Sequence, residues 1–213
     1  MSSASLIGVS RLRIGSDGHG ITTLVGFRGC PLRCKYCLNP QCFSTSYHFR
    51  EWTPEEVMRI LLKDELYFIT SGGGVSFGGG EPLLWPEFII EIINLGAKMW
   101  HTTIETSLNV PFDSIEKLYP YIDEYIIDIK DMNPIIYESY TGKDNKFVLS
   151  NLSKMLKDGM EPKMKCRVPF IPGYNNSDDQ EHSFAELIDI GVTRIEKFDY
   201  LKKENSYERK RKM

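Results

Sequence analysis

Short apolar runs alternate with amphipathic stretches along this chain. Runs rich in β-branched and aromatic residues predict six strands, at residues 21–27, 74–77, 102–105, 125–129, 163–170 and 193–198. Helical patterns lie between them, which favours βα units around a parallel sheet. Six such units in 213 residues fit an open barrel better than a closed eight-fold barrel, which typically needs about 250 residues. We therefore expect an α/β fold, a partial, open (β/α)6 barrel, with residues 1–213 in a single domain.

Capping signals and apolar periodicity place the helices between these strands. Thr53, Pro54 and Glu56 form a capping box with proline at the first helical position, and this helix is expected to reach Leu66. Pro86 begins a second helix with an apolar side. Further helices are predicted at residues 114–118, 148–156 and 178–190.

The polar residues that stand out lie at or just beyond the carboxyl ends of the predicted strands. They are a group of cysteines after the first strand, followed by Glu81, Glu105, Asp128, Lys130 and Arg167. In parallel α/β barrels this rim is where active sites are built. We therefore expect these side chains to meet at one edge of the sheet.

Three cysteines form the most informative pattern, C-x3-C-x2-C at Cys30, Cys34 and Cys37. Three thiolates on one loop can hold three irons of a [4Fe–4S] cube, and such clusters normally take four cysteines, so one iron would stay open. Structural zinc usually takes two ligand pairs, and the sequence has no second pair. Zinc or plain reduced thiols remain the alternatives at this point. Cys166 is expected to be a small buried thiol, and Cys42 has no assigned role.

Composition narrows the class of protein. The chain is 41% hydrophobic and 26% charged, as is typical of a globular protein. No apolar run approaches the roughly 18 residues needed to cross a bilayer, and no secretion leader is recognisable. The net charge of −3 argues against nucleic-acid binding, and unpaired thiols favour a cytoplasmic location. Residues 202–213 are rich in Lys and Arg and are expected to form a basic flexible tail.

A glycine run follows the second predicted strand. Residues 78–80 are all glycine and precede Glu81 and Pro82. Glycines at such a turn let the backbone approach a ligand without a Cβ in the way. The run lacks the G-x-G-x-x-G spacing of a dinucleotide-binding turn.

These motifs together resemble a known family. The segment Cys30-x3-Cys34-x-Tyr36-Cys37 and the Gly-Gly-Glu-Pro run at 79–82 are similar to the signature of radical S-adenosylmethionine (radical SAM) enzymes. Five further stretches narrow the resemblance to the glycyl-radical-enzyme activating enzymes; they lie at residues 17–21, 26–34, 71–76, 128–133 and 167–173. The motifs occur in the order of that family, over about residues 9–200.

The resemblance implies one [4Fe–4S] cluster, ligated by Cys30, Cys34 and Cys37, and S-adenosyl-L-methionine (SAM) as second cofactor. The other implied contacts are Gly79, Gly80 and Glu81 to the SAM amino group; Tyr36 and Leu38 to the adenine; Glu105 and Thr106 near the ribose and carboxylate; and Arg167 to the carboxylate. Asp128 and Lys130 would lie near SAM and the incoming substrate glycine.

The resemblance also implies a function. The protein is expected to abstract a hydrogen atom from a backbone glycine of a partner glycyl radical enzyme. A second cluster is absent from the sequence, so electrons would come from an external flavodoxin or ferredoxin. Two alternatives are a radical SAM enzyme that modifies a peptide or small molecule and a non-enzymatic iron–sulfur or zinc protein.

The sequence departs from the family pattern at three places. Gly78 stands where serine is usual, and Glu105 replaces an aspartate. A histidine that often lies near the adenine is missing after Tyr200.

Overall fold

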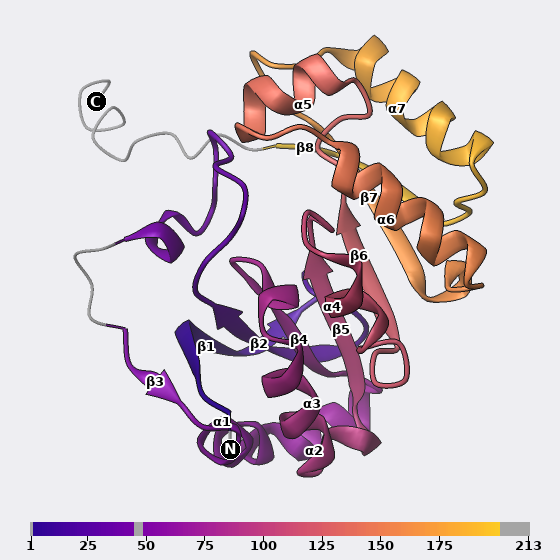
Figure 1. Cartoon of the computed structure of the whole chain (residues 1–213). Coiled ribbons are helices and arrows are strands. Elements are labelled where there is room, and N and C mark those ends of the chain that lie inside the picture. Colours follow the sequence, from indigo (N-terminus) through magenta and orange to yellow (C-terminus); the bar gives the residue numbers. More distant parts are fainter. Residues whose placement is uncertain (1, 45–48, 201–213) are drawn as a thin grey trace, which may run out of the picture.

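The computed structural model describes residues 2–44 and 49–200. Within them, one eight-stranded sheet runs through the molecule (Figure 1). Its strands are β1 (Ala4–Ile14), β2 (Ile21–Phe27), β3 (Glu51–Trp52), β4 (Gly74–Gly79), β5 (His101–Thr106), β6 (Glu124–Asp128), β7 (Met164–Phe170) and β8 (Ile195–Asp199). The predicted basic tail at residues 202–213 lies outside the described residues.

The strand order is β3-β1-β2-β4-β5-β6-β7-β8. From β2 to β8 every neighbouring pair is parallel, and these are the six predicted strands. The sheet ends at β3 on one side and β8 on the other, so the predicted partial, open (β/α)6 barrel is confirmed. The sequence did not predict β1 and β3, which extend the sheet antiparallel from β2.

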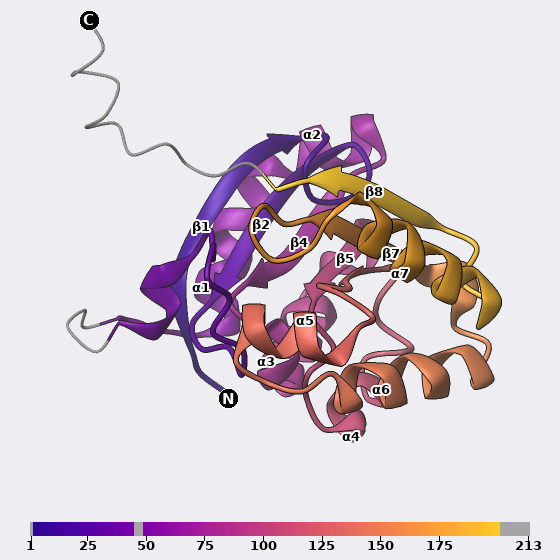
Figure 2. The same cartoon turned by 90° about the horizontal axis from the view of Figure 1, so that it is seen from above.

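Seven α-helices connect the strands of the described chain. They are α1 (Pro54–Leu61), α2 (Glu65–Ser71), α3 (Pro86–Asn94), α4 (Phe112–Glu116), α5 (Pro134–Thr141), α6 (Lys146–Lys157) and α7 (Ser177–Asp189). Seen from above, α3, α4, α6 and α7 lie along the outer side of the curved sheet (Figure 2). None of the helices in the described segments has the length and apolar character of a membrane span.

The core lies between the sheet and these outer helices. In β4, Val75 and Phe77 are fully buried, and the Phe77 ring lies 6.3 Å from the Phe27 ring of β2. Ile89 and Ile92 of α3 are also fully buried, which agrees with the predicted apolar side of that helix. Because parallel strands are covered by helices on this face, their other face is left to build the site.

The first predicted helix is shorter than expected. Its capping box is present, since Thr53 accepts from the Glu56 amide and Glu56 accepts from the Thr53 amide. The helix ends at Leu61, however, and a 3-10 turn (Leu62–Asp64) separates it from α2. The reason is Asp64, whose fully buried carboxylate accepts hydrogen bonds from Arg11 and Thr23 and is thereby held against the sheet.

Candidate functional site

The three predicted ligand cysteines lie on the loop after β2. Cys30, Cys34 and Cys37 are half-buried free thiols, and the Cys37 amide donates to the Cys34 carbonyl at 3.2 Å. The neighbouring amides of Arg33 and Lys35 donate to the carbonyls of Thr141 and Tyr140, at 2.8 and 3.1 Å. The cysteine loop is therefore anchored on the last turn of α5.

Helix α5 was not predicted, although its signals are present in the sequence. Asn133 caps it by accepting from the Ile135 amide at 2.9 Å, Pro134 is its first residue, and Gly142 ends it in the left-handed conformation. These are standard start and stop signals for a helix. Its carbonyl end is what positions the cysteine loop.

Cys42 lies at the far end of the same loop. It belongs to a 3-10 helix (Pro40–Phe43), is buried, and its carbonyl accepts from the Gly29 amide at 3.2 Å. This contact closes the loop just before Cys30. Cys166 is fully buried in β7, as predicted.

The glycine run packs directly against the backbone of the cysteine loop. The Gly80 amide donates to the Phe27 carbonyl at 2.9 Å, and the Glu81 amide donates to the Gly29 carbonyl at 2.7 Å. A Cβ on Gly80 would lie only 2.1 Å from the Gly29 carbonyl oxygen. Gly79 has φ +90°, and its carbonyl accepts from the side-chain amide of Asn39 at 3.0 Å. Glycine at these positions is therefore required for the approach of the two loops.

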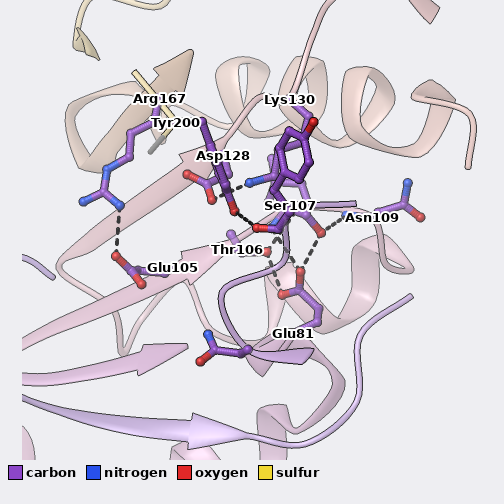
Figure 3. Close-up of polar contacts among 12 residues, drawn as sticks. Glu81, Glu105, Thr106, Ser107, Asn109, Asp128, Lys130, Arg167 and Tyr200 are labelled. Carbon is purple, nitrogen blue, oxygen red and sulfur yellow. Dashed lines mark hydrogen bonds and ion pairs between the residues drawn. The ribbon is translucent and has the colours of Figure 1, made fainter. Parts of the chain in front are cut away.

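The Glu81 carboxylate is 1% exposed and already has several donors (Figure 3). One oxygen accepts from the Thr106 hydroxyl at 2.7 Å, and the other accepts from the Ser107 amide and hydroxyl at 3.0 and 2.7 Å. The Leu83 amide also donates to Glu81. Burial raises the pKa of Glu81, and the hydrogen bonds from Ser107 and Thr106 oppose that rise. Glu81 therefore ties the loop after β4 to the loop after β5, and Ser107, which had no predicted role, takes part in this contact.

Two ion pairs lie on the inner side of the sheet (Figure 3). Arg167 donates to Glu105 at 3.0 Å and also to the Ser16 carbonyl at 3.0 Å. Lys130 donates to Asp128 at 2.8 Å, while the second Asp128 oxygen is buried and has no hydrogen-bond partner among the described residues. The structure thus brings together Glu105 of β5, Asp128 of β6 and Arg167 of β7, with Lys130 on the loop that follows β6.

Burial and charge set the protonation of this group. Burial alone lowers the pKa of Lys130, but the charge and hydrogen bond of Asp128 act against it, and the net pKa is raised. Burial raises the pKa of Glu105, the negative charge of Asp128 adds to this, and Arg167 opposes it. Lys130 therefore carries a fixed positive charge.

A polar cavity of about 240 Å³ adjoins the first of these ion pairs, since Arg167 lines it. Its walls come from the β1–β2 loop and from β6, β7 and β8, and include Ser16, His19, Glu124, Lys165, Arg167 and Glu196. Lys165 pairs with Glu196 at 2.7 Å. Arg167 therefore connects the cavity to the rim that carries the cysteine loop.

Tyr36 and Leu38, predicted next to the adenine, differ in their surroundings. Tyr36 lies among aromatic rings, with those of Tyr174 and Tyr140 at 5.6 and 6.1 Å, and its hydroxyl donates to the Pro172 carbonyl at 3.1 Å. Leu38 is 56% exposed.

A buried polar cluster next to the site was not predicted. Asp131 accepts from the Asn133 amide at 2.9 Å, from the Ser183 hydroxyl at 3.2 Å and from the Asn175 side chain at 3.1 Å. All but Asn133 are buried. The cluster joins the loop after β6, which carries Lys130, to the segment after β7. The only sequence signal for it is the position of Asp131 one residue after Lys130.

Comparison with known proteins agrees with this geometry. Residues 24–185 match the model of the radical SAM superfamily. The chain belongs to the radical SAM superfamily. It is 35% identical to a pyruvate formate-lyase-activating enzyme of Clostridium pasteurianum over 186 residues, which cover 87% of this chain and 76% of the relative. An enzyme of the same name from Staphylococcus aureus (strain USA300) is 33% identical over 192 residues, 87% of this chain and 75% of the relative. The resemblance inferred from the motifs is therefore confirmed.

The solved structures support the same fold. Streptococcus suis SuiB bound to the precursor peptide SuiA matches this radical SAM protein with a TM-score of 0.62 at 19% identity. The match covers 95% of this chain and 44% of SuiB, so the chain spans less than half of that protein. Membership of the superfamily implies SAM and a [4Fe–4S] cluster as cofactors.

Proposed function

We propose that this protein is an activase that abstracts a hydrogen atom from a backbone glycine of a partner glycyl radical enzyme. Relatives with the name pyruvate formate-lyase-activating enzyme, at 33 and 35% identity over most of the chain, support this activity. The observation that carries it is the placement of three free thiols, on one anchored loop, beside Asp128 and Lys130, whose charges act on the Cys34 thiol.

The residues present fit one [4Fe–4S] cluster held by Cys30, Cys34 and Cys37. Their thiols are half-buried and form no disulfides. No group of three or more His, Cys, Asp or Glu within residues 2–44 and 49–200 is arranged to hold a metal ion. In a cube each thiolate binds a different iron, so the three sulfurs need not converge on one point. When bound, the cluster and SAM supply one-electron cleavage of a sulfonium carbon–sulfur bond, which provides a hydrogen-abstracting carbon radical.

The chain's own residues would orient SAM on this rim. Arg167 is proposed to bind the SAM carboxylate, because a guanidinium fork is suited to carboxylates; here it already pairs with Glu105 at 3.0 Å and with Glu196 at 3.6 Å. Glu105 and Thr106 would lie near the ribose and carboxylate. Gly79 and Gly80 would offer backbone atoms to the amino group. Glu81, whose oxygens are already accepting hydrogen bonds, would act by fixing this backbone and Thr106.

The remaining assignments concern the adenine and the substrate. Tyr36 and the backbone at Leu38 would border the adenine. Lys130 keeps its proton because Asp128 faces it, so it would act as a fixed positive charge beside SAM and the incoming glycine. The buried, unpaired oxygen of Asp128 is available as an acceptor at the same place.

The electron source is proposed to be external. Beyond the three ligands the sequence contains only Cys42 and Cys166, which is too few for a second cluster. A low-potential carrier such as flavodoxin or ferredoxin would therefore supply the electron to the cluster. We propose a cytoplasmic location. The net charge of −3 argues against a nucleic-acid partner.

The test is anaerobic reconstitution with iron and sulfide, followed by SAM, dithionite and a candidate glycyl radical enzyme. The expected results are one cluster per chain, formation of 5′-deoxyadenosine, and a doublet in the paramagnetic resonance spectrum of the partner. Replacement of Cys30, Cys34 or Cys37 by Ala should abolish all three. Cys166→Ala, which removes a thiol from β7, is the matched control and should retain them.

Other outcomes separate the alternatives. One equivalent of zinc, or a full cluster that gives no 5′-deoxyadenosine, would contradict the enzyme assignment. Formation of 5′-deoxyadenosine with a peptide or small molecule, but never a doublet in any partner enzyme, would favour the other radical SAM activity.

A further inference from the structure

Tyr200 connects the end of the sheet to the cysteine loop. It directly follows β8, and its amide donates to the Phe170 carbonyl at 2.8 Å, which continues the contact between β7 and β8. Its hydroxyl donates to the Tyr36 carbonyl at 2.5 Å. Tyr36 and Tyr200 are 164 positions apart in the sequence, so this hydrogen bond is a long-range contact.

The position of this hydrogen bond is specific. The Tyr36 carbonyl belongs to the peptide that precedes Cys37, so the hydroxyl holds the orientation of that peptide plane. The Cys37 amide, on the same peptide, donates to the Cys34 carbonyl at 3.2 Å. Both hydrogen-bonding groups of this peptide are therefore fixed, one by Tyr200 and one within the loop.

The aromatic rings around Tyr200 keep its hydroxyl in place. Its ring lies 6.2 Å from Tyr36, 6.3 Å from Tyr140 and 6.3 Å from Phe198. Tyr140 belongs to α5, whose last carbonyls accept from the cysteine loop. Loop, helix and strand end thus meet at one small cluster of rings, and Tyr200 supplies the hydrogen bond from the β8 side.

We propose that Tyr200 is a positioning residue for the cluster: its hydroxyl fixes the peptide before Cys37 and so sets the direction of that ligand. The inference rests on the proposed cluster ligands and is independent of the identity of the partner enzyme.

The test compares Tyr200→Phe with Tyr174→Phe. Both remove one phenolic hydroxyl from the same ring cluster; the Tyr200 hydroxyl donates to the cysteine loop, whereas Tyr174 contacts Tyr36 of that loop through its ring. The reconstituted proteins are treated anaerobically with an iron chelator, and the loss of cluster absorbance is followed. Loss of one hydrogen bond of average strength corresponds to a change of about fivefold in the rate at which the cluster is released. We expect release about fivefold faster in Tyr200→Phe and close to the wild-type rate in Tyr174→Phe.

Two further measurements separate positioning of the cluster from general stability. The g values of the reduced, SAM-bound cluster should shift in Tyr200→Phe and not in Tyr174→Phe. Thermal unfolding of the cluster-free proteins should be similar in the two variants. An unchanged rate of cluster release together with unchanged g values in Tyr200→Phe would overturn the proposal. A melting temperature of the cluster-free variant that is low enough to explain its faster cluster release would overturn it as well. Failure of the wild type to bind a cluster would instead contradict the proposed function.

Discussion

Gly80→Ala tests the close approach of the glycine run to the cysteine loop. The added Cβ would lie 2.1 Å from the Gly29 carbonyl oxygen and 2.8 Å from that of Phe27. Both are backbone atoms, which cannot rotate away as the end of a side chain can. Real Cβ atoms essentially never come within 3.0 Å of such neighbours, so the loops must separate by about 0.9 Å.

The magnitude follows from this displacement. Overpacking of this kind costs about 1–3 kcal/mol. The separation also weakens the bonds from Gly80 N to Phe27 O and from Glu81 N to Gly29 O, each of which contributes about 1 kcal/mol. We expect the free energy of unfolding to fall by about 3 kcal/mol. Iron content after reconstitution should fall as well, because Gly29 directly precedes Cys30.

Urea unfolding of the cluster-free protein and iron analysis after reconstitution provide the assay. Gly78→Ala is the matched control, since its Cβ would meet the mobile end of Leu24 at 3.2 Å and the Glu105 carboxylate at 3.3 Å. It should change the free energy of unfolding by less than about 1 kcal/mol. Equal stability and full iron content in Gly80→Ala, or equal damage by Gly78→Ala, would refute the reasoning.

Three further predictions concern the carboxylates of Glu81 and Asp131, which are buried, and of Glu105, which is half-buried. Glu81→Gln places an amide opposite the Ser107 donors, so thermal or urea unfolding should show a loss of about 2 kcal/mol. Asp131→Ala leaves buried donors of Asn175 and Ser183 without their acceptor, and the same assay should show a loss of about 3 kcal/mol. Glu105 has a raised pKa in the folded state, so it binds its proton more tightly there than when unfolded. The stability of the wild type relative to Glu105→Gln should therefore decrease as pH rises above the ordinary value of 4.5.

Each of these has a result that would contradict it. A Glu81→Gln protein as stable as the wild type would mean that the Ser107 contacts do not hold the two loops. If Asp131→Ala unfolds like the wild type, the polar cluster does not join the segments after β6 and β7. A stability difference for Glu105→Gln that grows with pH would reverse the sign of the argument.

The sheet could be predicted largely because its central parallel strands are well buried, most of all β4, whose first five residues are buried. Their apolar runs are visible in the sequence, and the predicted strand at 21–27 has the bounds of β2 (Ile21–Phe27). β1 (Ala4–Ile14) is interrupted by Gly8, and its second half is largely exposed. Its sequence therefore shows only a weak strand pattern. β1 is held in the sheet by its pairing with β2, and a local sequence pattern does not predict such long-range pairing.

The sequence predicted which residues form the candidate site, but it did not predict the contacts among them. Glu105 and Arg167 were placed at neighbouring strand ends, and the structure joins them by an ion pair at 3.0 Å. Glu81 was expected to face a ligand, whereas its carboxylate is buried among donors from the next loop. Its partners Thr106 and Ser107 lie 25 and 26 positions away, so the sequence contains no local sign of the contact between the two loops. The ligand and SAM contacts themselves remain predictions.

The central claim is that three thiolates hold a cluster with which this protein generates a glycyl radical in a partner enzyme. The most direct measurement is the paramagnetic resonance spectrum of a glycyl radical enzyme after anaerobic mixing with reconstituted protein, SAM and dithionite. The account predicts a doublet that requires SAM and disappears when Cys30, Cys34 or Cys37 is replaced by Ala. A wild-type protein with a full cluster that forms no 5′-deoxyadenosine and yields no doublet would contradict it.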